Sequence, residues 1–247
     1  MARGWMDLPR NGTAQSVTDL IDTTEMYLRT IYELIEDGVP PLRARIAEQL
    51  GHSGPTVSQT IARMERDGLV IVDTDRTLRL TPEGEETAVR VMRKHRLAER
   101  LLTDIIGLDL PHVHDEACRW EHVMSERVEK RVLELLGEPA LSPYGNRIPG
   151  LDELGITSMD PAGSRSSELS VFEAVENDVT SATLVRIGEN PQTLADFLTI
   201  AVEIGLLPGA AVTLESHGGR ISITTERGSV EIPGDAARHL FVEQGSK

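Results

Sequence analysis

Residues 43–80 read RARIAEQLGHSGPTVSQTIARMERDGLVIVDTDRTLRL, and they carry the clearest structural signal of the first domain. Residues 43–50 predict a short helix, and the glycine that follows ends it. A second helix is expected to begin near Pro55, because proline is favoured in the first turn and Ser53 or Gly54 can serve as the N-cap. The sequence therefore predicts two helices separated by a tight turn.

The apolar residues of the second helix and the residues after it complete the pattern. Val57, Ile61 and Met64 are spaced i, i+4, i+7, which places them on one face of the helix. Residues 69–72 and 77–80 then predict two short strands joined by a polar turn. Helix, tight turn, helix and hairpin follow one another in the order typical of a winged helix-turn-helix.

The outer face of the second helix carries side chains suited to DNA: Thr56, Ser58, Gln59, Arg63 and Arg66. An amide such as that of Gln59 can hydrogen-bond a base edge, while arginine reaches phosphate or guanine. An isolated amphipathic helix with such a face is more often simply solvated. The turn before it and the hairpin after it favour a DNA-binding helix instead.

The rest of the chain divides by composition and periodicity, and the fold class expected is mainly α with β. The expected regions are a loose arm at residues 1–18, a winged helix-turn-helix domain at residues 19–80, a helical dimerisation and metal-binding domain at residues 81–154, a linker region rich in Pro, Gly and Ser at residues 139–167, and a small β-barrel domain at residues 168–247. Within the last region we expect strands at residues 182–187, 211–215, 221–225 and 230–232 and a helix at residues 194–204.

Three further helices are predicted from apolar spacing, at residues 18–38, 81–106 and 111–136. We expect the last of these to bury a stripe of Val113, Ala117, Trp120, Met124, Val128 and Leu135. The helix before it offers apolar residues either for a dimer interface or for the chain's own core, and these are Leu97, Leu101, Leu102 and Ile105.

The charge distribution bounds the possible partners. The net charge of −15 argues against nucleic-acid binding when taken alone. Residues 150–247 hold 15 acids and 6 bases, which leaves −6 for residues 1–149, and residues 43–79 carry six arginines against five acids.

No apolar run approaches the roughly 20 residues that span a bilayer, and no secretory signal is visible. With a single cysteine, this favours a cytoplasmic protein without a membrane partner.

Two helical clusters mix residues that bind transition metals. Cys118, Glu121 and His122 stand at i, i+3 and i+4, so that their side chains can meet on one cation. His95 and Glu99 are spaced i, i+4 on the preceding helix. Any one histidine is more often exposed or hydrogen-bonded than a ligand, but two such clusters favour metal binding. The spacing does not say which residues share an ion.

Several segments resemble the diphtheria toxin repressor and iron-dependent regulator family of actinobacteria. They are residues 22–31 (DTTEMYLRTI), 53–60 (SGPTVSQT), 62–68 (ARMERDG), 92–100 (MRKHRLAER) and 114–122 (HDEACRWEH). The resemblance runs almost without gaps from Thr18 to Leu154. It implies a Fe(II)-dependent transcriptional repressor, with a winged helix-turn-helix, a helical dimerisation domain and a C-terminal SH3-like barrel.

The resemblance also implies the site residues. An activating metal site falls on Met26, Cys118, Glu121 and His122, with the Cys118 carbonyl as a further ligand. An ancillary metal site falls on His95, Glu99, His114, Glu189 and Gln192. A neighbouring anion site falls on Arg96, Ser142 and Asn146. The DNA contacts fall on Arg43, Ser53, Pro55, Thr56, Ser58, Gln59, Arg63, Arg66 and Arg76.

The donor chemistry agrees with iron as the cofactor, at two sites per chain. Thioether and thiolate are soft donors, whereas carboxylate and imidazole are harder, and the mixture suits Fe(II) while accepting Co(II), Ni(II), Zn(II) or Mn(II) in vitro. A methionine on the first helix is more often a core residue than a ligand. The expected partners are a second copy of the chain and double-stranded palindromic operator DNA, with two dimers per operator before iron-uptake and siderophore genes.

Two alternatives follow from the same residues. A manganese-responsive regulator of the same superfamily would favour carboxylates where Met26 and Cys118 stand. A metallo-hydrolase would need an open coordination position and a general base near the metal, and no His-Glu-x-x-His motif is present. We therefore expect a regulator and not an enzyme.

Overall fold

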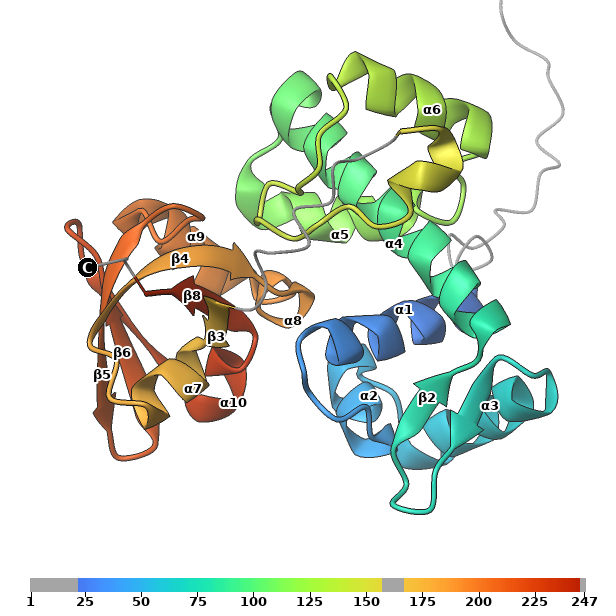
Figure 1. The fold of residues 1–247 in the computed structure, drawn as a ribbon, viewed down its shortest axis with the longest axis horizontal. Coiled ribbons are helices and arrows are strands. Elements are labelled where there is room, and N and C mark those ends of the chain that lie inside the picture. The colour runs from blue at the N-terminus through green and yellow to red at the C-terminus, as the bar shows by residue number, and fades with distance from the viewer. Residues whose placement is uncertain (1–21, 157–166, 245–247) are drawn as a thin grey trace, which may run out of the picture.

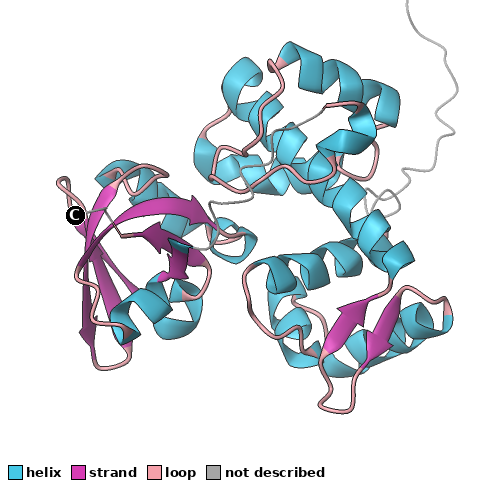
Figure 2. Ribbon diagram, in the orientation of Figure 1, coloured by secondary structure: helices cyan, strands magenta, loops and turns pink. Residues whose placement is uncertain are grey.

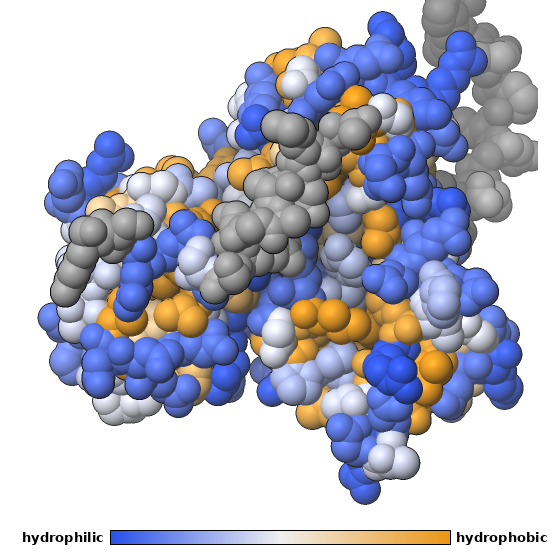
Figure 3. All heavy atoms as spheres, in the orientation of Figure 1, coloured by the Kyte–Doolittle hydropathy of each residue, from blue (hydrophilic) through white to orange (hydrophobic). Residues whose placement is uncertain are grey.

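The computed structural model describes residues 22–156 and 167–244, which form three bodies along the chain (Figure 1). An N-terminal helical body carries a two-stranded hairpin, a second body is entirely helical, and the C-terminal body is built on a sheet (Figure 2). None of the helices in these two ranges combines the length and apolarity that crossing a membrane requires. The face shown in Figure 3 is largely hydrophilic, with apolar residues in separate patches.

The N-terminal body has the predicted order of elements. These are α1 (Thr23–Glu36), α2 (Arg43–Leu50), α3 (Gly54–Arg66), β1 (Val70–Val72) and β2 (Leu78–Leu80). Helix α3 begins where expected, because the Ser53 side chain accepts a hydrogen bond from the Thr56 amide and a proline stands in the first turn. Helix α1 begins later than the expected residue 18, because the Asp22 side chain caps the amides of Thr24 and Glu25. The earlier residues lie outside the described ranges.

One apolar core joins these helices. Leu28 and Ile31 of α1 and Val57 and Ile61 of α3 are fully buried in the same cluster. The wing is an antiparallel pair of strands, β1 and β2. A displacement of α1 must therefore carry α3 with it, since close-packed side chains leave no room for one helix to slide alone.

The helical body consists of α4 (Pro82–Leu101), a π-helical turn (Leu102–Ile106), α5 (Leu110–Trp120) and α6 (Glu126–Leu135). Gly84 in the first turn of α4 lies against the wing, where an added Cβ would stand 2.0 Å from the Leu69 carbonyl oxygen. Only glycine allows this close approach, because it has no Cβ atom. It fixes the start of α4 against the DNA-binding body.

The single helix predicted for residues 111–136 is wrong, because the chain turns between α5 and α6. The buried face of α5 includes Val113 and Ala117, and that of α6 includes Val132 and Leu133. On one straight helix these two faces would point roughly a third of a turn apart, and the turn between α5 and α6 lets both pack against α4. The break sets the residues at the end of α5 facing α1 and α4.

The predicted stripe is only partly buried, and the apolar residues of α4 and the turn after it divide between the two alternatives left open by the sequence. Val113, Ala117 and Met124 are buried and Trp120 is half-buried, but Val128 and Leu135 are 48 % and 60 % exposed. Leu97 and Leu102 are buried in the chain's own core, and Leu101 is half-buried. Ile105 is 54 % exposed and is the member of that set still available to a second copy. The apolar period of a helix does not reveal which neighbour covers it.

The described part of the predicted linker is a packed segment. Tyr144 and Asn146 are fully buried, and a short 3₁₀ helix at Leu151–Leu154 follows. The Tyr144 hydroxyl donates to the Leu110 carbonyl at 2.8 Å, which ties the segment to α5. Residues 157–166 of that linker lie outside the described ranges.

The C-terminal body contains the expected strands in one antiparallel sheet, ordered β3-β8-β4-β5-β6-β7. Its elements are β3 (Glu168–Ser170), α7 (Val171–Glu176), β4 (Ser181–Ile187), α8 (Glu189–Gln192), α9 (Ala195–Ile204), β5 (Ala211–His217), β6 (Arg220–Thr224), β7 (Ser229–Pro233), α10 (Gly234–Ala237) and β8 (Leu240–Glu243). The short elements β3, α7, α8, α10 and β8 were not predicted. Helices α7, α9 and α10 pack against the sheet.

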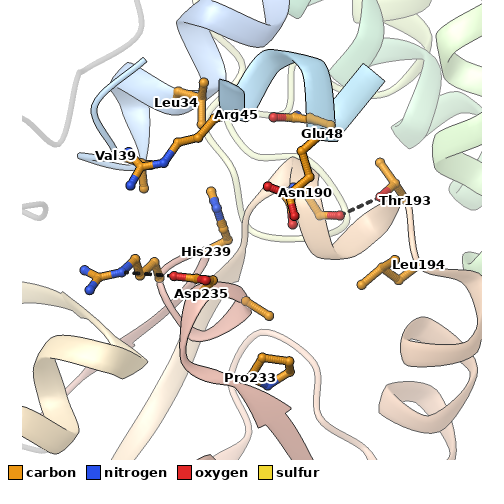
Figure 4. Close-up of a pocket in the computed structure, with 13 residues that line it drawn as sticks. Leu34, Val39, Arg45, Glu48, Asn190, Thr193, Leu194, Pro233, Asp235 and His239 are labelled. Atoms are coloured by element: carbon orange, nitrogen blue, oxygen red, sulfur yellow. Dashed lines mark hydrogen bonds and ion pairs between the residues drawn. The ribbon is translucent and has the colours of Figure 1, made fainter. Parts of the chain in front are cut away.

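The C-terminal body contacts both others through buried charges. Arg186 on β4 donates to Asp37 at the end of α1 (2.7 Å), and His239 lies 2.7 Å from the same carboxylate. A cleft of about 460 Å³ opens beside this joint, with Arg45 and Glu48 of α2 opposite Asp235 (Figure 4). None of the candidate metal ligands lines this cleft.

Candidate metal centre and nucleic-acid interface

Four of the predicted ancillary residues form one buried cluster. His95 and Glu99 come from α4, His114 from α5 and Glu189 from α8, and one ligand atom of each lies within 4.8 Å of all the others. His95 Nε2 lies 2.9 Å from Glu99 Oε1, and His114 Nδ1 lies 3.5 Å from Glu189 Oε2. The C-terminal body thus reaches into the helical body at this cluster.

The cluster contains buried polar atoms without a hydrogen-bond partner. They are Glu99 Oε2, His114 Nδ1 and Glu189 Oε2, of which the last two form an ion pair at 3.5 Å. Gln192 Oε1, on the same short helix as Glu189, is a fourth buried oxygen without a hydrogen bond. The Gln192 amide nitrogen donates to the Ile187 carbonyl at 2.9 Å, so the orientation of its oxygen is fixed. Leaving such atoms unpaired in the interior costs free energy, and all four are of the kind that binds a divalent cation. The residues therefore fit a metal ion.

The electrostatics of Glu189 support the same interpretation. Burial alone would raise the pKa of its carboxyl group, but the Arg96 guanidinium and the two neighbouring histidines outweigh burial and hold that pKa well below its usual range. The group is an anion at neutral pH. In this structure its cationic partner is Arg96 at 3.0 Å, and its ionised oxygens are of the kind that binds a metal ion.

The predicted activating residues lie next to this cluster, at the break between α5 and α6. Cys118 is in the last turn of α5, and Glu121 and His122 follow it. His122 Nε2 lies 3.3 Å from Glu121 Oε1, and its Nδ1 lies 2.7 Å from Glu25 Oε2 on α1. Burial would raise the pKa of the Cys118 thiol, but Arg29 and His114 lower it well below its usual range. A thiolate is the form that binds metal.

Met26 is the predicted ligand from the DNA-binding body. It is half-buried in the first turns of α1 and packs beside the apolar core. Glu25 next to it contacts His122, and Arg29, three residues later, contacts Cys118. Residues three and four apart share a helix face, so this face of α1 is turned towards the Cys118 turn.

His95 joins the two clusters, which the sequence did not reveal. Its Nε2 belongs to the ancillary cluster, while its Nδ1 lies 2.6 Å from Glu121 Oε2. Sequence reasoning also missed three residues of α1: Glu25 and Arg29, which contact the Cys118 turn, and Glu33, which pairs with Arg29. Their i, i+4, i+8 spacing was the available signal, since it places three charges in one row of an otherwise amphipathic helix.

The three predicted anion-site residues are buried near one another but are paired with protein groups. Arg96 donates to Glu36 and Glu189 and to the Arg147 carbonyl. The Ser142 hydroxyl accepts from the Tyr144 amide, and the Asn146 amide donates to the Ile187 carbonyl at 2.7 Å. The carboxylates occupy the place that an anion would take at this guanidinium. The anion site stays a prediction.

The predicted DNA contacts lie on the surface of the first body. The exposed ones are Ser53, Pro55, Thr56, Ser58, Gln59, Arg63, Arg66 and Arg76. Arg43 is half-buried. Arg76 stands at the tip of the wing with a φ of 71°, the left-handed conformation of a tight turn. Helix α3 and the wing therefore present one polar face from two elements.

Two family models match the chain in order. Residues 19–78 match the DNA-binding domain of iron-dependent repressors, and residues 81–150 match their metal-binding and dimerisation domain. The diphtheria toxin repressor of Corynebacterium diphtheriae is 53 % identical over 228 residues, which cover 92 % of this chain and 99 % of that protein. The chain belongs to the iron-dependent repressor family.

Other members of the family agree. The iron-dependent repressor IdeR of Mycobacterium tuberculosis is 49 % identical over 92 % of this chain and 100 % of its own length. The crystal structure of T. acidophilum IdeR has a TM-score of 0.70 at 27 % identity, and the match covers 91 % of this chain and 99 % of that one. A manganese-dependent transcriptional repressor in complex with manganese has a TM-score of 0.70 at 26 % identity, with 90 % and 100 % coverage. These relatives are repressors, so the hydrolase alternative is set aside.

Proposed function

We propose that this chain is a Fe(II)-activated repressor whose metal-loaded homodimer binds palindromic operators before iron-uptake and siderophore genes. The observation that carries the proposal is the convergence of α4, α5 and α8 on buried donor clusters that also contact α1. The family membership supports the DNA-binding and dimerising roles of the first two bodies.

We assign two Fe(II) sites per chain. The activating site would use Met26, Cys118, Glu121 and His122. The ancillary site would use His95, Glu99, His114, Glu189 and Gln192. A divalent cation supplies the positive charge that lets thiolate and carboxylate ligands lie close together, and Co(II), Ni(II), Zn(II) or Mn(II) can supply it in vitro.

Contacts between side chains connect the proposed metal site to the DNA-binding body. Glu25 attaches α1 to His122 in the Cys118 turn at 2.7 Å, and α1 shares its core with the recognition helix α3. Fixing α1 against the dimerisation body therefore fixes the separation of two recognition helices across a dimer, which sets the half-site spacing. We expect two dimers per operator, and we expect the protein in the cytoplasm, where its DNA is.

The expected gain in DNA affinity on metal binding follows from thermodynamic linkage. A ligand shifts a conformational equilibrium only by its preference for one state. At 100 times the dissociation constant this preference supplies roughly 2.7 kcal/mol, or about 100-fold in DNA affinity.

A manganese-responsive regulator is the second candidate, because the family fold is shared with the manganese-dependent repressor named above. Cys118 argues against it, since a thiolate is a poor match for Mn(II), which prefers oxygen ligands.

The test is an anaerobic titration of operator binding with Fe(II) and with Mn(II) at matched free-ion concentrations. Met26→Ala and Cys118→Ala should lose the metal dependence, whereas His112→Ala, an exposed histidine on the same helix as Cys118, should keep it. Metal-dependent binding that survives in both site variants would refute the activating site. Activation by Mn(II) and not Fe(II) would favour the second candidate.

A further inference from the structure

Arg29 places a guanidinium nitrogen between two proposed donors of the activating site, Cys118 and Glu121, and His95 of the neighbouring cluster. Its Nη1 lies 3.2 Å from Cys118 Sγ, 2.8 Å from Glu121 Oε2 and 3.0 Å from His95 Nδ1. One ligand atom from each of these three residues lies within 4.8 Å of the others, as the donors of a metal ion would. A single N–H-bearing nitrogen therefore contacts all three at once.

The guanidinium is held from its other side as well. Arg29 Nε lies 2.9 Å from Glu33 Oε1, and the Gln49 amide donates to the second oxygen of that carboxylate at 2.6 Å. Arg29 is only 6 % exposed. A buried cation with this many anionic neighbours is a structural counter-charge and not a solvated side chain that happens to lie nearby.

The same contacts place Arg29 in competition with a metal ion. The Sγ and Oε2 lone pairs that accept from Nη1 are the ones a cation would use, and two positive charges in one buried donor set repel each other. We propose that Arg29 is an internal competitor for the activating metal: its guanidinium holds the Cys118–Glu121 donors in the metal-free protein and must withdraw from them when metal binds. This rests on the proposed function and adds a residue that sets the metal concentration at which it operates.

The role explains the arrangement of charge on α1. Arg29 pairs with the buried carboxylates of both Glu33 and Glu121, so removing it takes one counter-charge from each of them. With Arg29 present, the site is neutralised until a divalent ion outcompetes a single positive charge. Because Arg29 is on α1, its withdrawal also changes how the DNA-binding body is attached to the Cys118 turn.

The test measures metal binding and does not use DNA. Metal-free wild type and Arg29→Gln are titrated anaerobically with Co(II), and the thiolate-to-Co(II) charge-transfer absorbance reports binding at Cys118. A chelator competition gives the affinity. We expect Arg29→Gln to bind Co(II) about tenfold tighter or more, the effect of removing one charge-assisted contact.

Two further variants control the result. Arg93→Gln removes another buried arginine, paired with Glu129 at 2.7 Å and making no contact with the candidate ligands, and its Co(II) affinity should equal that of wild type. The double variant Arg29→Gln/Glu33→Gln removes both buried charges together and should also bind tighter, which keeps the test available if the single variant does not fold.

The outcomes are distinguishable. Unchanged or weaker Co(II) binding in the Arg29 variants, with a normal thiolate band in wild type, would overturn the competition and leave the activating site intact. No thiolate band in any of the proteins would overturn the site itself.

Discussion

Replacing Arg96 with alanine is expected to lower the thermal midpoint of the metal-free protein by roughly 6–12 °C. The guanidinium is fully buried and donates to Glu189 at 3.0 Å and to Glu36 at 3.1 Å. Removing one partner of a buried pair costs about 3–5 kcal/mol, because the other charge is left in the interior. We take about 3 kcal/mol, the lower end of this range, because Glu189 still has His95 as a partner at 3.5 Å. A chain of this size shifts by about 2–4 °C per kcal/mol.

The assay is differential scanning calorimetry of chelator-treated protein, with Arg100→Ala as the matched control. Arg100 is on the same helix, its side chain is 30 % exposed, and it pairs with Asp104 at 3.0 Å. A pair of that exposure is worth at most about 1 kcal/mol, so its midpoint should fall by no more than about 2–4 °C. Adding Co(II) should reduce the difference in thermal midpoint between wild type and Arg96→Ala, because a cation at the ancillary cluster gives Glu189 a new partner. Equal shifts for the two variants in the metal-free protein would refute the reasoning.

Three other predictions test the fold and the DNA interface. Glu129→Ala removes the buried partner of Arg93 and should cost about 3 kcal/mol in thermal unfolding, and a loss within about 0.5 kcal/mol would contradict the burial of that pair. Gly84→Ala places a Cβ 2.0 Å from the Leu69 carbonyl oxygen and should lower the free energy of unfolding measured by urea denaturation by about 1–3 kcal/mol; a neutral result would mean that α4 and the wing separate easily. Gln59→Ala should weaken operator binding in band-shift titrations by about 1–3 kcal/mol at unchanged thermal midpoint, and undiminished affinity would remove it from base recognition.

The elements whose signals are local could be predicted. Ser53 and Pro55 mark the start of α3 because a cap and a first-turn proline act within one turn of helix. The nearness of Cys118 and Glu121 could be predicted because i, i+3 spacing at the end of a helix places two side chains on one face. The short strands β3 and β8 could not be found, because each is stabilised by a partner some 70 residues away.

The remaining parts of the site depend on contacts between distant segments. His95 lies between two clusters, Arg29 enters the Cys118 turn, and Asp37 attaches α1 to the C-terminal body. In the sequence these residues look like ordinary charges on amphipathic helices. Which of them lose their water, and against which partner, is settled only when three bodies pack.

The sequence by itself determined the winged helix-turn-helix, the identity of most candidate ligands and the family, because capping, helical periodicity and residue spacing act over one to three turns. Only the tertiary structure decided that the helix after residue 110 breaks, that the two ligand clusters adjoin through His95, and that an arginine stands among the donors. The physical reason is that burial of charge is a property of the assembled interior: desolvation and Coulomb attraction between α1, α4, α5 and α8 have no counterpart along the chain.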